Sequence, residues 1–387
     1  MKEVDCLSDS IKKLAAETFR EIGESLEQGA LGSALRLGIT VLGSEHGPEE
    51  IVRGAEIAQR AYPGLEVVLI GPRVKSNLAQ LRAADEEEQH KIMEEALEKG
   101  DLAACVTMNY NFPIGVSTVG RIIAPATGRK MLVATTTGAS DSQREAAMVK
   151  NSIYGLAVAK AQGLANPTLG ILNVDSARAV ERNLKQLAAN GYKLTFAESV
   201  RGGGPLMRGN DLLMGSPDVL VTDTLTGNVL MKVFSAFNSG GNYETLGSGY
   251  GPGVGAAGEK IILIISRASG APVAAEALKF AEEVARGGLV KAVKAELAAA
   301  GKAGLDDLLK RGAEKTRVDT VSAPPEKIVT EEITGLDILE LETAQQALWK
   351  EGIFARSGMG CTGPIILTAP EDFETARIVL KKEGLLD

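Results

Sequence analysis

One of the three cysteines, Cys361, lies in the segment Gly358-Met-Gly-Cys-Thr-Gly-Pro364, where glycines on both sides leave its sulfur uncrowded. A thiolate can hold an acyl group as a thioester, which divides a difficult acyl transfer into two easier steps. This chemistry requires the pKa of the thiol to be lowered from about 8.5, and the nearby Arg356 could supply the positive charge. The segment therefore predicts Cys361 as a nucleophile or acyl carrier. The alternative is a small buried hydrophobic residue, the common fate of an isolated cysteine.

A second stretch that could do chemistry is Asp223-Thr-Leu-Thr-Gly-Asn228, which follows the apolar run Val219–Val221. Apolar residues resume at helical spacing over 229–234, so the pattern predicts a strand, a polar turn and a helix. Such a layout aims free backbone N–H groups and a helix dipole at an anion. We therefore expect Asp223 to orient the turn, and we expect contacts to phosphate or to a carbonyl oxygen from Thr226, Gly227 and Asn228. An ordinary strand–helix connection would show the same pattern.

Two other polar residues are candidates for the same anion site. Lys232 lies one helical turn beyond Asn228, although a solvated lysine is as good an interpretation. His46 lies in a loop flanked by glycines and could act as a general base near phosphate, or it could be an exposed loop histidine. The glycine runs at 202–204 and 249–258 resemble phosphate cradles, but a mobile lid or a docking loop fits them equally well.

Metal chemistry is disfavoured by the residue inventory. The chain has only two histidines, His46 and His90, which nearly excludes a histidine-based metal centre. Its three cysteines are far apart and form no C-x-x-C pair, so they indicate neither a zinc site nor a disulfide framework. Cys105 lies in an apolar strand, where core packing is the better interpretation and a redox thiol the lesser one. We therefore expect no metal and no tightly bound cofactor.

The composition is that of a globular protein. The 387 residues are 44% hydrophobic and 24% charged. A net charge of −8 argues against nucleic acid or an anionic membrane as a general partner. No apolar run approaches the roughly 20 residues that span a bilayer. The N-terminus has no apolar signal core, so we expect a cytoplasmic protein.

Strands and helices alternate along most of the chain. The apolar runs predict strands at 35–42, 66–72, 102–107, 131–135, 168–174, 193–197, 219–221 and 260–266, with helices at 86–99, 179–190 and 272–285 among those between them. Repeated strand–helix–strand order predicts an α/β fold with a doubly wound, mostly parallel sheet. In such a sheet the loops after the strands meet at one edge and bind ligands there.

Three segments are expected. Residues 1–32 form an N-terminal amphipathic helix, residues 33–297 an α/β core, and residues 298–387 a C-terminal α/β extension that carries the Cys361 loop. The composition changes after Gly287, and Pro324-Pro325 indicates a linker. Within the extension we expect helices at 344–350 and 371–383 and a strand at 365–367.

Four separated motifs resemble the PlsX family of phosphate acyltransferases, over roughly residues 36–290. They are Gly47-Pro-Glu-Glu-Ile-Val-Arg-Gly-Ala55, Gly100-Asp101, Gly170-Ile-Leu-Asn173 and Asp223-x-x-Thr226-Gly227-Asn228-x-x-x-Lys232. The resemblance implies a fold like those of phosphate acetyltransferase and isocitrate dehydrogenase, acyl phosphate formation from an acyl thioester, and Asn109 and Asn111 as ligands by family position. The family's Lys-Gly-Asn is replaced here by a segment ending in Glu181-Arg-Asn183, which disfavours a fatty-acyl carrier protein as substrate.

With the Cys361 loop included, the whole chain resembles the alpha subunits of protein C in glycine/sarcosine/betaine reductase complexes. This resemblance implies that an acetyl thioester on a cysteine is cleaved by inorganic phosphate to acetyl phosphate. It also implies a hetero-oligomer with a beta subunit related to ketoacyl-synthase III and thiolase, and with selenoprotein A carrying a carboxymethyl group. Two alternatives remain: a PlsX-type acyl-acyl carrier protein:phosphate acyltransferase, and a non-catalytic scaffold for the beta subunit.

Overall fold

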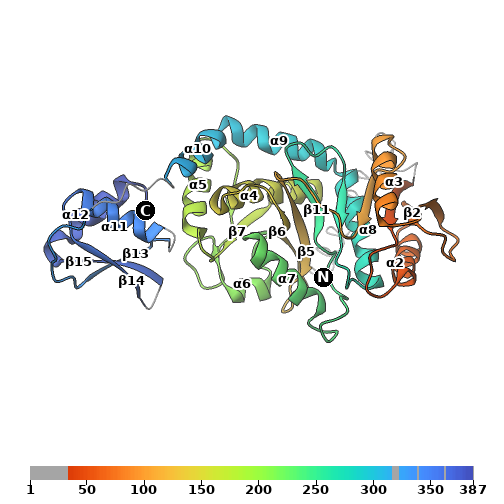
Figure 1. The fold of residues 1–387 in the computed structure, drawn as a ribbon, viewed down its shortest axis with the longest axis horizontal. Helices are drawn as coiled ribbons and strands as arrows, with labels where there is room; N and C mark the ends of the chain where they lie inside the picture. Colours follow the sequence, from red (N-terminus) through yellow and green to blue (C-terminus); the bar gives the residue numbers. More distant parts are fainter. Residues whose placement is uncertain (1–33, 316–321, 338–339, 361–362, 387) are drawn as a thin grey trace, which may run out of the picture.

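The structure is a computed structural model that describes residues 34–315, 322–337, 340–360 and 363–386. The expected N-terminal helix at 1–32 lies outside the described residues. Figure 1 shows an elongated molecule in which the first strands and helices, the centre of the sheet and the C-terminal residues follow one another along the long axis.

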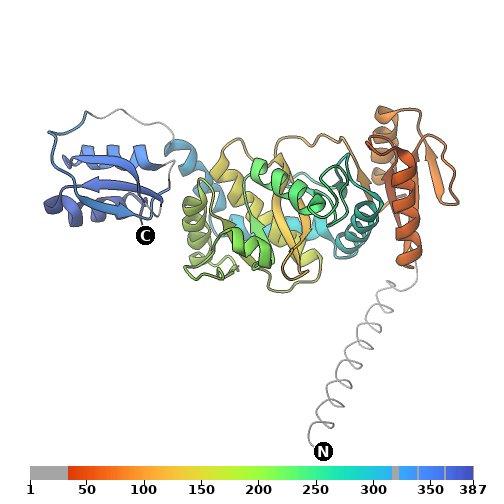
Figure 2. The ribbon, with the colours of Figure 1, turned by 90° about the horizontal axis from the view of Figure 1, so that it is seen from below.

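A long mixed sheet with helices on both faces organises residues 34–315 (Figures 1 and 2). Its strands are β1 (Leu35–Thr40), β2 (Leu65–Gly71), β3 (Ala79–Arg82), β4 (Ala104–Thr107), β5 (Val116–Ile123), β6 (Lys130–Ala139), β7 (Thr168–Leu172), β8 (Thr195–Phe196), β9 (Leu206–Met207), β10 (Val219–Val221), β11 (Gly251–Gly255) and β12 (Ile262–Ile264). The helices are α2 (Pro48–Ala61), α3 (Glu86–Glu98), α4 (Arg144–Ala161), α5 (Ala177–Ala189), α6 (Gly209–Met214), α7 (Thr224–Ala236), α8 (Ala271–Arg286), α9 (Leu289–Lys302) and α10 (Leu305–Lys315).

The strand order is β3-β2-β1-β4-β12-β11-β5-β6-β10-β7-β8, with β9 beside β7. Strands β3, β2, β1, β4 and β12 run parallel to one another, and so do β6, β10, β7 and β8. Between these halves, β11 pairs antiparallel with β12 and β5, and β5 pairs antiparallel with β6. The α/β, mostly parallel fold is confirmed. The expectation that all loops after strands meet at one edge is wrong, because the antiparallel connection reverses the second half.

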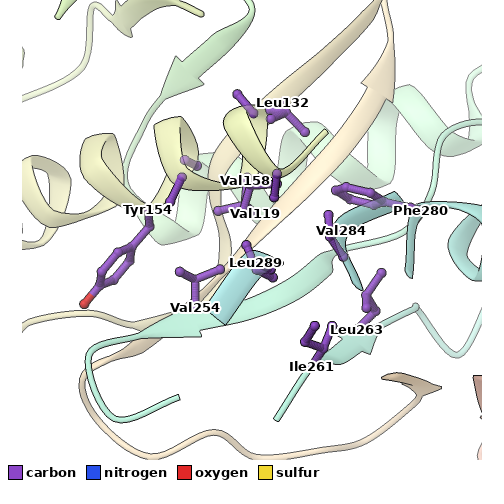
Figure 3. Close-up of a cluster of buried hydrophobic side chains, with 14 of the residues drawn as sticks. Val119, Leu132, Tyr154, Val158, Val254, Ile261, Leu263, Phe280, Val284 and Leu289 are labelled. Carbon is purple, nitrogen blue, oxygen red and sulfur yellow. The ribbon is translucent and has the colours of Figure 1, made fainter. Parts of the chain in front are cut away.

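The middle of the sheet is buried on both faces, as apolar strands of this kind require. Alternate residues of β6 and β10 serve opposite clusters: Leu132 and Val219 pack with α4, whereas Val133 and Leu220 pack with α6 and α7. Figure 3 shows the larger cluster, in which Val119, Val158, Phe280 and Leu289 bring strand β5 and helices α4, α8 and α9 together.

The glycine-rich run at 249–258 is part of the sheet and is neither a phosphate cradle nor a lid. Its central residues form β11, between β12 and β5. A Cβ on Gly251 would lie 1.9 Å from the carbonyl oxygen of Val119, and one on Gly253 would lie 2.2 Å from the ring of Phe112. Glycine is therefore required here by close packing.

In the first turn of α6, Asp211 is fully buried and accepts four hydrogen bonds. Its carboxylate oxygens receive the backbone N–H groups of Val200 and Arg208 at 2.8 Å each, and the hydroxyl groups of Ser199 and Ser216 at 2.9 and 3.0 Å. Burial alone would raise the pKa of Asp211, but these donors outweigh it and lower the pKa below its ordinary value.

We predict that Asp211→Asn lowers the free energy of unfolding by about 3 kcal/mol. The new amide NH₂ must face a backbone N–H that can only donate, which leaves that group without an acceptor. Because the folded-state pKa is lowered, the wild-type contribution is present above pH ~4 and is lost as pH falls through the folded-state pKa. Urea unfolding at several pH values measures both effects. Asp175→Asn, at an ion pair whose aspartate is half exposed, should change stability by less than about 0.5 kcal/mol.

The C-terminal residues form a separate unit with its own apolar cluster. Strand β15 (Gly363–Thr368) lies between β13 (Glu331–Thr334) and β14 (Ala355–Gly360), all antiparallel, and is accompanied by α11 (Leu341–Lys350), the short η2 (Pro370–Asp372) and α12 (Phe373–Lys382). The expected boundary after residue 297 falls inside α9, and α10 belongs to the main core through Leu305 and Leu308. An ion pair between Arg182 and Glu340 joins this unit to α5.

Candidate active site at the start of helix α7

The segment predicted as a polar turn is the first turn of helix α7. Asp223 is its N-cap: the carboxylate accepts the backbone N–H of Thr226 at 3.1 Å and the hydroxyl of Thr226 at 2.6 Å. The N–H of Gly227 bonds to the carbonyl of Asp223 at 2.9 Å. The helix starts earlier than expected because an aspartate cap satisfies N–H groups that would otherwise favour an open turn.

This capping changes which predicted donors are available. The hydroxyl hydrogen and the N–H of Thr226 are used by Asp223, and the N–H of Gly227 is used within the helix. The N–H groups of Thr224 and Leu225 remain, since the first turn of a helix has no internal acceptor for them. Of the three residues expected to bind phosphate, Asn228 has a side-chain donor left over.

Asn228 lies against the end of strand β6. One hydrogen of its Nδ2 goes to the carbonyl of Thr136 at 3.1 Å, so its second N–H and its Oδ1 are available to a ligand. Threonine hydroxyls surround this point: Thr136 and Thr118 share a hydrogen bond of 2.6 Å. The buried hydroxyl of Thr222 has no partner among the described residues. These nearest groups are therefore polar and uncharged, and the carboxylate of Asp223 lies at the cap of the same helical turn.

Lys232 follows Asn228 at i+4 and so lies on the same face of α7. Its Nζ donates to Glu244 at 2.9 Å and to the hydroxyl of Ser266, and lies 6.0 Å from the ring centre of Tyr250. Desolvation alone would lower the pKa of Lys232, but the hydrogen bond and charge of Glu244 raise it above its ordinary value. The lysine is thus a fixed cation that links α7 to the residues after β12.

His46 lies in the loop between β1 and α2. This loop contacts the residues after β12, because the N–H of Glu45 bonds to the carbonyl of Arg267 at 2.9 Å. Its ring packs edge-on against Tyr243 at 5.0 Å, and its Nε2 is buried without a hydrogen-bond partner among the described residues. Tyr243 donates to Glu50, which also accepts the N–H of Ala271 at 2.7 Å. The chain from Tyr243 to the adjacent Glu244 connects the surroundings of His46 with those of Lys232.

The other predicted site residues are not brought to α7 by any contact among the described residues. Asn109 bonds to Glu86 at 3.3 Å, and Asn111 is exposed in the same loop. Arg356 is on β14 of the C-terminal unit, where it pairs with Glu326. Cys361 lies outside the described residues, in the two-residue connection between the paired Gly360 and Gly363.

Cys105 is fully buried in β4, and burial strongly raises the pKa of its thiol. Core packing is therefore confirmed for this cysteine. Within the described parts of the chain, no group of three or more histidine, cysteine, aspartate or glutamate side chains could hold a metal ion. None of the helices there is both long and apolar enough to cross a membrane.

Residue patterns did not identify three of the groups that complete the site: Thr136, Glu244 and Ser266. Ser266 and Glu244 reach Lys232 across 34 and 12 positions of sequence, and no local pattern reports such a contact. The run Thr135-Thr-Thr137 at the end of a predicted strand was a usable signal for Thr136, because hydroxyls at a strand end are common ligands.

Comparison with known proteins places the chain in a family. Residues 35–367 match the family model described as "Fatty acid synthesis protein". The chain is 52% identical over 381 residues to the "Glycine/sarcosine/betaine reductase complex component C subunit alpha" of Peptoclostridium acidaminophilum, a match that covers 97% of this chain and 99% of that protein. It is 28% identical to the "Phosphate acyltransferase" of Thermus thermophilus, over 51% of this chain and 70% of that one.

Among solved structures, a branched-chain phosphotransacylase from Enterococcus faecalis aligns with 65% of this chain and 99% of its own, at 19% identity and a TM-score of 0.46. The family model and the component C relative both extend beyond the core into the C-terminal unit, whereas the phosphate acyltransferase match covers about half of the chain. The chain therefore belongs to the fatty acid synthesis protein family and, within it, groups with the component C alpha subunits.

Proposed function

We propose that this chain is the alpha subunit of a component C of the glycine/sarcosine/betaine reductase type, and that it transfers an acetyl group from a cysteine thioester to phosphate. The observation that carries the proposal is the polar face of α7. Along it Thr224, Asn228 and Lys232 recur at i+4 spacing, which combines amide and N–H donors with a fixed cation in a chain closely related to a component C alpha subunit.

The chemistry divides into two parts. The sulfur of Cys361 holds the acetyl group, and an oxygen of hydrogen phosphate attacks the thioester carbonyl. The C–S bond breaks, the thiolate leaves, and acetyl phosphate is released. Asn228 and the first N–H groups of α7 would bind the phosphate or the developing oxyanion, which is charge stabilisation of the kind that usually dominates acyl transfer. Lys232 would lower the cost of bringing an anion there, and His46 would accept a proton.

The proposal includes partners and reactants that belong to the same reaction. A beta subunit related to ketoacyl-synthase III and thiolase, and selenoprotein A as the source of the two-carbon unit, would complete a hetero-oligomer. Inorganic phosphate would be a substrate, without a tightly bound cofactor. The related phosphate acyltransferase favours a second candidate, direct acyl transfer from acyl carrier protein to phosphate. A third candidate is that this chain only holds the beta subunit in place, in which case the chain itself would catalyse no reaction.

Arsenate-dependent hydrolysis of acetyl phosphate tests the proposal, because arsenate accepts the acetyl group in place of phosphate and the acetyl arsenate formed hydrolyses spontaneously. We expect the purified chain, with its beta subunit present, to catalyse this reaction. Asn228→Ala should lower the rate by about 100- to 1000-fold, the usual effect of removing one oxyanion donor. Asn238→Ala, an exposed asparagine just beyond the other end of α7, should leave the rate unchanged. An Asn228→Ala enzyme with the wild-type rate would exclude this face as the site.

A further inference from the structure

A cleft between helix α5 of the core and the C-terminal unit is lined by more cations than anions. Its volume is about 380 Å³, and its lining includes Arg178 of α5 and Arg377 of α12, with Glu332 of β13 as the acidic residue. Figure 1 shows α5 at the end of the core that faces the C-terminal unit. Pockets of this volume commonly hold small molecules. None of the residues that line this cleft belongs to the candidate site on α7.

Arg178 lacks a partner of the kind that its neighbour on the same helix face has. Arg178 and Arg182 are four residues apart, so both leave α5 on the side that meets the C-terminal unit. Arg182 pairs there with Glu340. Arg178 is half-buried, yet it forms no ion pair or side-chain hydrogen bond with another described residue. It is also the second residue of α5, whose first turn has no acidic residue, so the positive end of the helix dipole adds to its charge.

Arg377 is a second unpaired cation, contributed by the C-terminal unit. Its guanidinium lies 5.8 Å from the ring centre of Phe373, a contact that orients the group and leaves its N–H donors free. Arg377 is half-buried and forms no ion pair within the described parts of the chain, and the exposed Glu332 pairs with neither arginine. Two neighbouring cations that are partly shielded from water repel one another. The electrostatics of the cleft therefore favours a bound anion.

Two guanidinium groups from different elements favour phosphate over a carboxylate. One guanidinium fork can occupy both oxygens of a carboxylate, which lie in a single plane. A phosphate group carries oxygens in several directions, so it can accept hydrogen bonds from two forks at once. The lining also includes Ile333 and Leu386, which suit a short apolar group attached to the phosphate. We therefore infer that this cleft binds the phosphate group of a small molecule between Arg178 and Arg377.

Phosphate in the cleft would also hold the C-terminal unit against the core, because each part contributes one arginine. Thr334, in the lining of the cleft, ends β13 and pairs with Ile365. Gly360 pairs with Gly363 at the same end of this small sheet. A bound phosphate would thus fix the end of the unit that carries these two glycines. The inference goes beyond the proposed function and does not depend on it, since it concerns a second anion site away from α7.

Isothermal titration calorimetry of the purified full chain with inorganic phosphate tests the inference. The titration is run in the wild type and in Asn228→Ala, which removes a donor from the α7 face, and we expect phosphate binding to remain in that variant. Arg178→Gln and Arg377→Gln, each added to Asn228→Ala, should weaken this binding at least about 10-fold, because each removes hydrogen bonds between charged groups. Arg60→Gln removes the same charge from the exposed last turn of α2 and should leave the affinity unchanged.

Acetyl phosphate and acetate identify the chemistry that the cleft selects. Acetyl phosphate should compete with inorganic phosphate for the cleft. Acetate should bind at least about 10-fold more weakly than either, because it can fill only one guanidinium fork. Glu332→Gln should tighten phosphate binding, since it removes the carboxylate from the lining.

Unchanged phosphate affinity in both arginine variants would overturn the inference, because the phosphate would then be bound elsewhere. Absence of binding at millimolar phosphate in the wild type and in Asn228→Ala would overturn it as well. Acetate that binds as tightly as phosphate would refute the assignment of the ligand to the phosphate class. Far-UV circular dichroism spectra should be the same for all variants, which separates a loss of binding from a loss of folding.

Discussion

Replacing Cys361 by alanine should abolish arsenate-dependent hydrolysis of acetyl phosphate, with a loss of at least about 1000-fold. In the proposed reaction the thiolate is the group that accepts the acetyl unit, and removing a covalent nucleophile leaves only positioning and electrostatic effects. The purified variant with its beta subunit is assayed beside the wild type. Mass spectrometry after exposure to acetyl phosphate should show an acetyl group on Cys361 in the wild type and none in the variant.

Cys105→Ala is the matched control, because it removes a thiol that is fully buried in β4. It should keep the rate per folded molecule while costing some stability through the small cavity that it leaves. Activity that survives Cys361→Ala would instead support direct transfer from an acyl carrier protein to phosphate. Absence of turnover in the wild type would leave only the scaffold role.

Local patterns predicted much of the core correctly. The bounds of β10 agree with the apolar run 219–221, and α3 ends within one residue of the prediction, because apolar runs and helical spacing are properties of a few neighbouring residues. Strands β5 and β11 were missed because one is rich in polar residues and the other in glycine. Both are buried through contacts with strands that are distant in sequence, and the reversal of the second half of the sheet depends on those two strands.

The candidate site was predictable to a similar extent. The i+4 spacing of Asn228 and Lys232 already places both on one face of a helix. The sequence did not predict that the N–H and the hydroxyl of Thr226 both donate to Asp223, because these hydrogen bonds depend on where the helix begins. Nor were the partners of Lys232, which come from the loop before β11 and the end of β12.

Gly227 was predicted to contact phosphate through its backbone N–H, but the structure requires glycine at this position for close packing. Its N–H belongs to the helix, but a Cβ at this position would lie 1.7 Å from the carbonyl oxygen of Thr135 and 3.2 Å from a methyl group of Thr222. The first of these is a backbone atom at the centre of the sheet and cannot rotate away. Glycine is thus what allows α7 to pack directly on β6 and to bring Asn228 to Thr136.

We therefore predict that Gly227→Ala lowers the free energy of unfolding by about 3 kcal/mol or more, since α7 or β6 must shift to relieve the overlap. Urea unfolding measures this loss. The shift also separates Asn228 from Thr136, so acetyl phosphate turnover should fall together with stability, even at temperatures where the variant is fully folded.

Gly301→Ala makes the same chemical change in helix α9, where no heavy atom lies within 4 Å of the added Cβ. There alanine should be neutral or should stabilise the protein by up to about 1 kcal/mol, because it restricts the unfolded chain and favours the helix. The contrast between the two glycines isolates packing from helix propensity. Wild-type stability in Gly227→Ala would mean that α7 does not rest on β6 at this distance, and the donors assigned to the phosphate would then have no fixed position.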